Sequence, residues 1–397
     1  MDPQNLPRGF RAGATATGVK ASGKPDLSIL YSEVPCAAAA VMTQNRLKGA
    51  ALYVTSEHLR DRRAQAVVIN SGVANGCTGD QGMKDAREMA RLTAEALHLR
   101  PDDVLVASTG IIGEFLPLEK IARGIREVAG SLSPDGGLDA AKGIMTTDTV
   151  PKVVSKEFDL DGGRATIWGM CKGAGMIHPR LATMLGFILT DAPIAESIAR
   201  PVLLEAVRTT FNRLTVDGDM SPSDTVMLLA NRMAGGPIID RLDSAAGKRF
   251  QEALREVCGA LAEKIARDGE GATKLIRIEV TGASDEEEAE RIARGIATSN
   301  LVKTAIAGGD PNWGRIVSAL GQHATVTDPN RAKVRLGDVL VYDDGVRAEY
   351  SERKAAEALA GNEVTIHVHL AEGKASARYL TCDFTEEYVK INADYHT

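Results

Sequence analysis

Ala182 and Thr183 stand at the head of a strongly apolar run, ATMLGFILT. A threonine hydroxyl is a weak nucleophile unless a base lies beside it. Cutting the bond before Thr183 would free its own α-amine as that base, and such a group titrates near about 7.7–8.0. The small Ala182 would leave the scissile carbonyl accessible. The same pattern also suits a β-branched residue that simply opens a buried strand, so the pattern alone leaves both interpretations open.

A glycine-rich segment precedes this pair. GMCKGAGMIHPR contains Gly169, Gly173 and Gly175 and carries Lys172, which predicts a flexible loop. A phosphate-binding loop needs a lysine and a hydroxyl residue after the last glycine, and no lysine follows the glycines in that register. The dinucleotide fingerprint G-x-G-x-x-G is also absent from the predicted strand-to-helix turns. The segment therefore gives no support to a nucleotide site.

Three further segments carry polar groups that suit acyl transfer. Thr109 and Gly110 end a predicted strand, where donors could face a developing oxyanion, although an ordinary glycine turn has the same pattern. TTDTVPK, from Thr146 to Lys152, is either a hydroxyl-rich site or a polar turn. DGEGAT places Glu270 in a turn after a helix, where it could meet an ammonium group or remain a solvated acid.

Composition narrows the class of protein. The chain has 397 residues, 44% of them hydrophobic and 25% charged, with a net charge of −6. No basic stripe indicates nucleic-acid binding, and no apolar run reaches the length of a membrane span. The first twenty residues lack the apolar stretch and cleavage site of a secretory signal. These features predict a globular, cytoplasmic protein without a nucleic-acid or membrane partner.

Cysteine and histidine spacing gives no metal motif. The five cysteines form no close pair, which predicts reduced thiols and no structural zinc site. His367 and His369 would share one face of a strand, but no third ligand is nearby. We therefore expect a packed or solvated strand face there, and no metal or organic cofactor.

Apolar patterning predicts mixed helices and strands. A hairpin is expected over 151–170 around Asp161-Gly162-Gly163. The expected strands lie near residues 26–32, 50–55, 64–70, 103–108, 182–194, 224–230 and 274–282, with several more between 331 and 385. The expected helices lie at 83–99, after Pro117, at 198–214 with an early interruption at Pro201, at 243–267, and from Asp285, whose acidic run suits a helix start. Without strict strand–helix alternation, the pattern favours a layered α+β fold.

Many of these segments together resemble one family. The chain is similar to the ornithine acetyltransferase (glutamate N-acetyltransferase) family of arginine biosynthesis, from about Gly9 to the C-terminus. The matching segments, in order, are GFRAGATATGVK, INSGVANGCTGDQG, STGIIGEFLP, TTDTVPK, KGAGMIHPRLATML, FNRLTVDGDMSPSDT, DGEGATK, NLVKTAIAGGDPNWGRI and INADYHT. The family often differs from this chain at Val73, Ala174, Arg180 and Ser223, none of which has an assigned catalytic role.

The resemblance implies a self-processing, layered α/β structure of the N-terminal-nucleophile type. Cleavage between Ala182 and Thr183 would give an α chain of residues 1–182 and a β chain of residues 183–397, assembled as a heterotetramer of two α and two β chains. Thr183 would be the nucleophile for processing and catalysis, and Thr109 and Gly110 would form the oxyanion hole. The implied substrate-site residues are Thr146, Lys172, Thr183, Glu270, Asn392 and Thr397.

The implied reaction moves an acetyl group from N-acetylornithine to glutamate through an acetyl-threonine. Lys172 would pair with the amino-acid carboxylate and Glu270 with the ornithine side-chain ammonium. No cofactor is implied, and some family members also accept acetyl-CoA as the donor. Two alternatives remain open: a self-processing aminopeptidase or amidohydrolase of the same architecture, and an unprocessed, non-catalytic amino-acid-binding protein. An intact Ala182–Thr183 bond would favour the last, because the amine base would never form.

Overall fold

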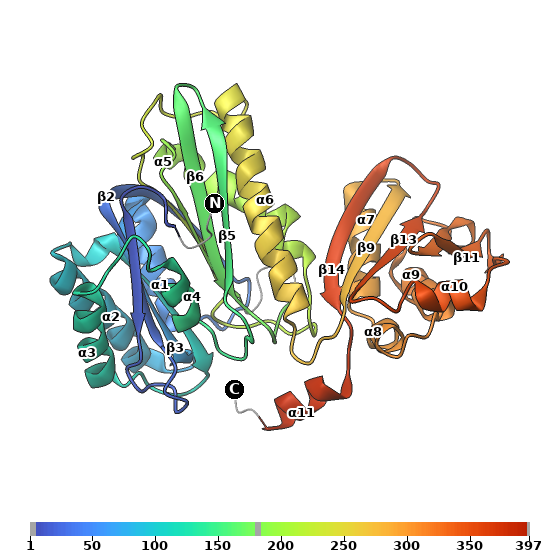
Figure 1. Ribbon diagram of the computed structural model, residues 1–397, viewed down its shortest axis with the longest axis horizontal. Coiled ribbons are helices and arrows are strands. Elements are labelled where there is room, and N and C mark those ends of the chain that lie inside the picture. Colours follow the sequence, from blue (N-terminus) through green and yellow to red (C-terminus); the bar gives the residue numbers. More distant parts are fainter. Residues whose placement is uncertain (1–4, 179–183, 395–397) are drawn as a thin grey trace.

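The structure is a computed structural model that describes residues 5–178 and 184–394. The described strands form one eight-stranded sheet and one six-stranded sheet. Figure 1 shows the two sheets in separate lobes, and the C-terminal helix extends from the smaller lobe back below the larger one. The sheet of the larger lobe combines strands that precede residues 179–183 with strands that follow them.

The long strand β2 (Leu27–Met42) organises the larger lobe. Its first half pairs with β3 (Arg63–Val73) and its second half with β8 (Thr225–Ala230), and the register shifts between Tyr31 and Cys36. A bulge of this kind bends a strand and increases its twist. The eight-stranded sheet consequently folds into two stacked layers. The other strands are β1 (Phe10–Thr15) and β4 (Val104–Ile111) in the first layer, and β5 (Lys152–Leu160), β6 (Gly163–Lys172) and β7 (Leu185–Thr190) in the second.

An apolar core fills the space between the two layers. Trp168, Phe187 and Met227 from the second layer pack with Leu30 and Ile69 from the first, and all five are fully buried. Removing large side chains from water supplies most of the energy that holds such layers together. Helix α4 (Gly137–Gly143) lies against β1 and β2 at this core and contributes small residues to it.

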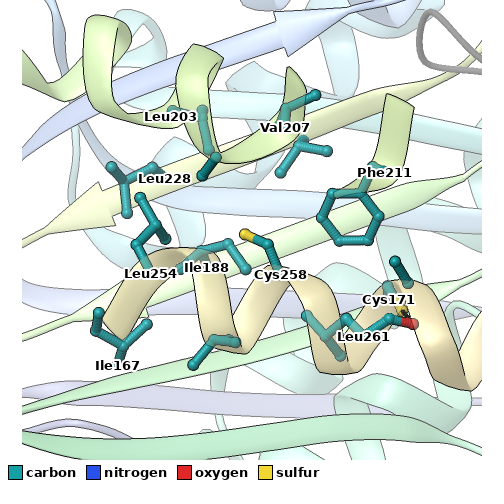
Figure 2. Packing of buried hydrophobic residues seen from close by; sticks show 14 of the residues in the cluster. Ile167, Cys171, Ile188, Leu203, Val207, Phe211, Leu228, Leu254, Cys258 and Leu261 are labelled. Carbon is teal, nitrogen blue, oxygen red and sulfur yellow. Dashed lines mark hydrogen bonds between the residues drawn. The ribbon is translucent and has the colours of Figure 1, made fainter. Parts of the chain in front are cut away.

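Helices cover both outer faces. Those over the first layer are α1 (Ala50–His58), α2 (Gly79–Leu97) and α3 (Leu118–Ala129), and those over the second are α5 (Glu196–Thr209) and α6 (Ala245–Arg267). Figure 2 shows Leu203 of α5 and Leu254, Cys258 and Leu261 of α6 packed around Ile188 of β7. The order is helix, sheet, sheet, helix, which confirms the layered α+β prediction.

The smaller lobe is built on the second sheet. Its strands are β9 (Leu275–Ala283), β10 (Lys333–Leu336), β11 (Val339–Asp343), β12 (Val346–Arg347), β13 (Glu363–His369) and β14 (Ala375–Cys382), and its helices are α7 (Glu286–Ala297), α8 (Asn300–Ala307), α9 (Trp313–His323) and α10 (Glu352–Glu357). Asp285 caps α7 by accepting a hydrogen bond from the Glu288 N–H at 2.8 Å, which confirms the predicted helix start. The described part of the chain ends in α11 (Glu386–Asp394), which has no buried residue.

Two sequence predictions are wrong in detail. Residues 50–55 form the start of α1 and not a strand, because a short apolar run is compatible with either element. The buried Thr55 fixes the helix against β4, since its hydroxyl donates to the Val106 carbonyl at 2.7 Å and accepts from the Val106 N–H at 2.8 Å. Pro201 lies inside α5 without ending it. The strand expected at 26–32 is β2, which continues to Met42, and the other predicted elements are present near their expected positions.

The five cysteines are free thiols, and only Cys77 is exposed. His367 and His369 lie on β13, where His367 faces Glu279 at 3.1 Å and His369 faces Thr281 at 3.1 Å. Within residues 5–178 and 184–394, no three His, Cys, Asp or Glu side chains form a group suited to a metal ion. None of the helices in the described part of the chain combines the length and the apolar character of a membrane span.

Candidate active site

A cavity of about 260 Å³ opens where the sheet ends of the larger lobe meet the turn after α6 and helix α11. It brings together six of the residues singled out from the sequence. These are Thr109, Gly110, Thr146, Lys172, Glu270 and Asn392. They come from segments up to 283 positions apart. Ala182, Thr183 and Thr397 lie outside the described residues.

Thr109 and Gly110 form the cavity wall at the end of β4. Gly110 pairs with Gly72 of β3 and has a φ of +129°. A Cβ atom at Gly110 would lie 2.2 Å from the Gly72 carbonyl carbon, so only glycine fits this close approach of two backbones. The neighbouring Thr109 side chain is buried and faces Lys172. The strand end is thus shaped to bring backbone and hydroxyl groups to the cavity.

Lys172 supplies the positive charge of the cavity. It is the last residue of β6, is only 3% exposed, and its Nζ lies 3.4 Å from Oγ1 of Thr109. Burial lowers the pKa of Lys172 below its ordinary value, and the nearby Asp148 carboxylate opposes that effect. A buried ammonium group with an open cavity beside it can bind a carboxylate strongly.

Glu270 lies across the cavity, just beyond the end of α6. Its N–H donates to the Ala174 carbonyl at 2.8 Å, which attaches this turn to the glycine-rich loop after Lys172. Its Oε2 accepts a hydrogen bond from Nδ2 of Asn392 at 2.8 Å. Because Asn392 lies on α11, this bond holds the C-terminal helix at the cavity.

Asp217 is a cavity residue that the sequence analysis missed. Its carboxylate accepts hydrogen bonds from the Met176 N–H at 2.5 Å, the Ile177 N–H at 2.9 Å and the Tyr388 hydroxyl at 3.2 Å. Burial raises the pKa of Asp217 above its ordinary value, while the two N–H groups lower it. The available signal was an acid before Gly218 in FNRLTVDGDM, a segment that matched the family without an assigned role.

Asp224 is a second acid outside the predicted set. It is fully buried directly before β8, and within residues 5–178 and 184–394 neither carboxylate oxygen has a partner in good hydrogen-bond geometry. Burial raises the pKa of Asp224 well above its ordinary value, with Lys172 opposing it. The sequence offered only its place in SPSDT, which gives no hint of burial.

The charges around the cavity indicate the class of ligand. Among the described lining residues, Lys172 is the one ammonium group, whereas Asp217, Asp219 and Glu270 carry carboxyl groups. A molecule with both a carboxylate and ammonium groups would find partners for each. The walls also include Thr109, Thr146 and Gly110, so the polar lining suits a small amino-acid-like ligand and its acyl group.

The chain is similar in sequence to a group of known proteins. A sequence model of the ArgJ family matches residues 11–397. An arginine biosynthesis bifunctional protein ArgJ from Symbiobacterium thermophilum is 48% identical over 393 residues, covering 98% of each chain. The protein of the same name from Thermus thermophilus is 46% identical over 398 residues, covering 99% of each chain.

One solved structure is similar to this chain in both sequence and fold. The crystal structure of an arginine biosynthesis bifunctional protein argJ from Bacillus halodurans is 39% identical, with a TM-score of 0.51. It covers 53% of this chain and 98% of its own. The match of the family model across nearly the whole sequence, and relatives at this identity, leave one conclusion: this chain belongs to the ArgJ family.

Proposed function

We propose that the protein transfers the acetyl group of N-acetylornithine to glutamate and thereby acts as an acyltransferase of arginine biosynthesis. The observation that carries this proposal is the meeting of Thr109, Gly110, Lys172 and Glu270 in one cavity. Their placement gives an acetylated amino acid a partner for its carboxylate, a partner for its side-chain ammonium and donors for its acetyl oxygen. Family membership supports the same reaction, because the curated relatives are named arginine biosynthesis proteins.

The first half-reaction would begin at Thr183. Cleavage before this residue frees its α-amine, which takes the hydroxyl proton while Oγ attacks the acetyl carbonyl carbon. Thr109 and Gly110 stabilise the negative oxygen of the tetrahedral intermediate. The bond between the acetyl carbon and the ornithine nitrogen then breaks, the nitrogen takes the proton, and ornithine leaves an acetyl ester on Thr183.

The second half-reaction reverses these steps with glutamate. Its amine attacks the ester carbonyl carbon, the Thr183 Oγ leaves and regains a proton, and N-acetylglutamate is released. Lys172 holds the α-carboxylate in both halves, and Thr146 and Asn392 complete the walls of the substrate site. Thr397 would close it from the chain end. Glu270 pairs with the ornithine ammonium group.

The proposed processing divides the chain into residues 1–182 and 183–397. The solved relative supports this division, because nearly all of its chain matches only about half of this one. We further propose that the two products assemble as two α and two β chains in the cytoplasm. The mass of the native particle tests this assembly, since a particle of one α and one β chain would contradict it.

Acetyl-CoA is the second donor that we propose. The relatives are named bifunctional proteins, and a nucleophile that forms an acetyl ester can take the acetyl group from a thioester as well. Formation of N-acetylglutamate from acetyl-CoA and glutamate, with no N-acetylornithine present, tests the point. Absence of that product would restrict the enzyme to one donor.

Steady-state kinetics tests the main reaction. With N-acetylornithine and glutamate both varied, the ester intermediate predicts parallel double-reciprocal lines. A brief incubation with N-acetylornithine alone should release ornithine and leave the chain that carries Thr183 one acetyl group heavier. Intersecting lines without acetylated protein would contradict the ester mechanism, and acetyl release to water at a rate independent of glutamate would favour the hydrolase.

A further inference from the structure

Three charged side chains form a buried row beside the cavity. Nζ of Lys152 lies 2.6 Å from Oδ1 of Asp148 and 2.5 Å from Oδ2 of Asp268. The exposed fractions of the three side chains are 0%, 0% and 7% for Lys152, Asp148 and Asp268. Burying such a row is costly, and apolar side chains of similar volume often stabilise a fold equally well. The row therefore calls for a role beyond stability.

One end of the row fixes two segments of the cavity wall. Oδ1 of Asp148 accepts a hydrogen bond from the Gly173 N–H at 2.7 Å, and Oδ2 accepts one from the Thr146 N–H at 3.0 Å. Gly173 directly follows Lys172, so its N–H sits at the point where the chain leaves β6. A single carboxylate thus sets the backbone of both Thr146 and Lys172, two residues that line the cavity.

The other end of the row reaches the opposite wall. Asp268 is the C-cap of α6 and lies two residues before Glu270. Its Oδ2 accepts from the Thr149 N–H at 3.0 Å, and its Oδ1 is hydrogen-bonded to the Thr149 hydroxyl. Lys152 and Thr149 precede the proposed cleavage point, whereas Asp268 and Glu270 follow it. The row therefore joins the two proposed chains at the substrate site.

We propose that Asp148 is a positioning residue that fixes Lys172 and Thr146 where they contact the substrate. Through its ion pair with Lys152, Asp148 is also linked to Asp268, which lies two residues before Glu270. The inference rests on the proposed function, because it assigns the row to the same substrate site. Asp148 does not line the cavity, so it acts through the groups that it holds.

The electrostatics of the row agree with this role. Burial would raise the pKa of Asp148, but Lys152, Lys172 and the Gly173 N–H hold it below its ordinary value. Burial would lower the pKa of Lys152, but the carboxylates of Asp148 and Asp268 raise it above its ordinary value. Both groups are thus charged at neutral pH.

Asp148 also acts on the charge of Lys172. The groups that influence the Lys172 ammonium are Asp148, Asp224 and Glu270, which favour its charged form, and Lys152 and Lys20, which oppose it. Thr109 contributes a neutral hydroxyl. Loss of the Asp148 charge should therefore lower the pKa of Lys172 further, and the substrate carboxylate would lose its partner at a lower pH.

The test is Asp148→Asn in the full-length enzyme. An amide can keep the acceptor toward Gly173 and Lys152, but its NH₂ group would then face the Thr146 N–H. Because hydrogen bonds to a charged carboxylate are stronger than those to a neutral amide, we expect KM for N-acetylornithine to rise by about tenfold to a hundredfold. The fall in kcat should be smaller, and the alkaline limb of kcat/KM should move to lower pH.

Asp139→Asn is the matched control. Asp139 also pairs with a lysine on its own segment, Lys142 at 3.2 Å, but both side chains are exposed. This variant should keep the wild-type KM and the wild-type alkaline limb. If Asp148→Asn keeps the wild-type KM and the wild-type alkaline limb, the inference is overturned, even if the melting temperature of the variant falls.

Asp268→Asn provides a second arm in case Asp148→Asn does not fold. It leaves the Asp148 bonds to Gly173 and Thr146 intact and weakens the links of Asp268 to Lys152 and Thr149. We expect KM to rise in the same direction but by a smaller factor. An unchanged KM in this variant would contradict the proposed link from Asp148 through Lys152 to Asp268. A wild-type enzyme without acetyl transfer would instead refute the proposed function, so the two failures are distinguishable.

Discussion

Gly175 and Glu270 approach so closely that a Cβ atom on Gly175 would lie 2.2 Å from Oε2 of Glu270. The glycine-rich loop after Lys172 therefore packs directly against the carboxylate of Glu270, which follows the proposed cleavage point. The contact involves the flexible end of the glutamate side chain and not its backbone. An added methyl group would move the carboxylate while leaving the fold intact.

Gly175→Ala should consequently weaken binding of the ornithine ammonium group. Loss of one charge-assisted contact predicts a rise in KM for N-acetylornithine of about tenfold, with little change in melting temperature. Gly163→Ala is the matched control, because a Cβ there meets nothing within 4 Å. Equal KM values for the two variants would argue that Glu270 does not contact the donor.

Thr109→Val removes a hydroxyl while keeping the shape of the side chain. If this hydroxyl stabilises the oxyanion, kcat should fall by about 10²–10³, with a much smaller change in KM. Initial-rate measurements with both substrates check this split. A wild-type kcat in this variant would show that the hydroxyl does not stabilise the oxyanion and only contacts Lys172, whose Nζ lies 3.4 Å away.

The pH profile should report on Lys172. Burial lowers the pKa of its ammonium group, so the charged form is present below that pKa and is lost as pH rises through it. Activity should therefore decline at high pH, at a value below the ordinary lysine range. A guanidinium group stays charged throughout, so Lys172→Arg should lose this alkaline limb even where its kcat/KM is lower. An alkaline limb that persists in Lys172→Arg would have to come from another group.

The sequence predicted the layers of the fold better than the details of the site. Long periodic segments such as α2 and α6 were found because their buried faces recur at helical spacing. The run at residues 50–55 was too short to separate helix from strand. It becomes a helix because its apolar side chains and Thr55 pack on β4.

For the site, motif resemblance located Thr109, Lys172 and Glu270, and the fold brings them to one cavity. It did not locate Asp148 or Asp217. Both carboxylates accept hydrogen bonds from backbone N–H groups, and each also contacts one side chain, Lys152 for Asp148 and Tyr388 for Asp217. Several of these partners are distant in the sequence; Tyr388 lies 171 positions after Asp217. Such contacts form only in the folded structure, so the sequence around each residue does not predict them.

The Tyr388 contact is one of three hydrogen bonds that attach the C-terminal helix. α11 has no buried residue and is attached by the Tyr388 hydroxyl on Asp217, by Asn392 on Glu270 and by the Thr385 hydroxyl on the Gly271 carbonyl at 2.7 Å. Tyr388→Phe removes one of these bonds. Amide exchange in α11 should accelerate by about fivefold to tenfold, which corresponds to about 1 kcal/mol. Unchanged exchange rates would mean that the other contacts suffice.

The central claim is that Thr183 becomes the N-terminal nucleophile by cleavage of the bond to Ala182. The most direct test is the intact mass of the purified protein under denaturing conditions, measured beside Thr183→Ala. The account predicts two fragments that meet at Ala182 and Thr183 in the wild type and one full-length chain in the variant. A single uncut wild-type chain would contradict the mechanism, because the α-amine base would be absent.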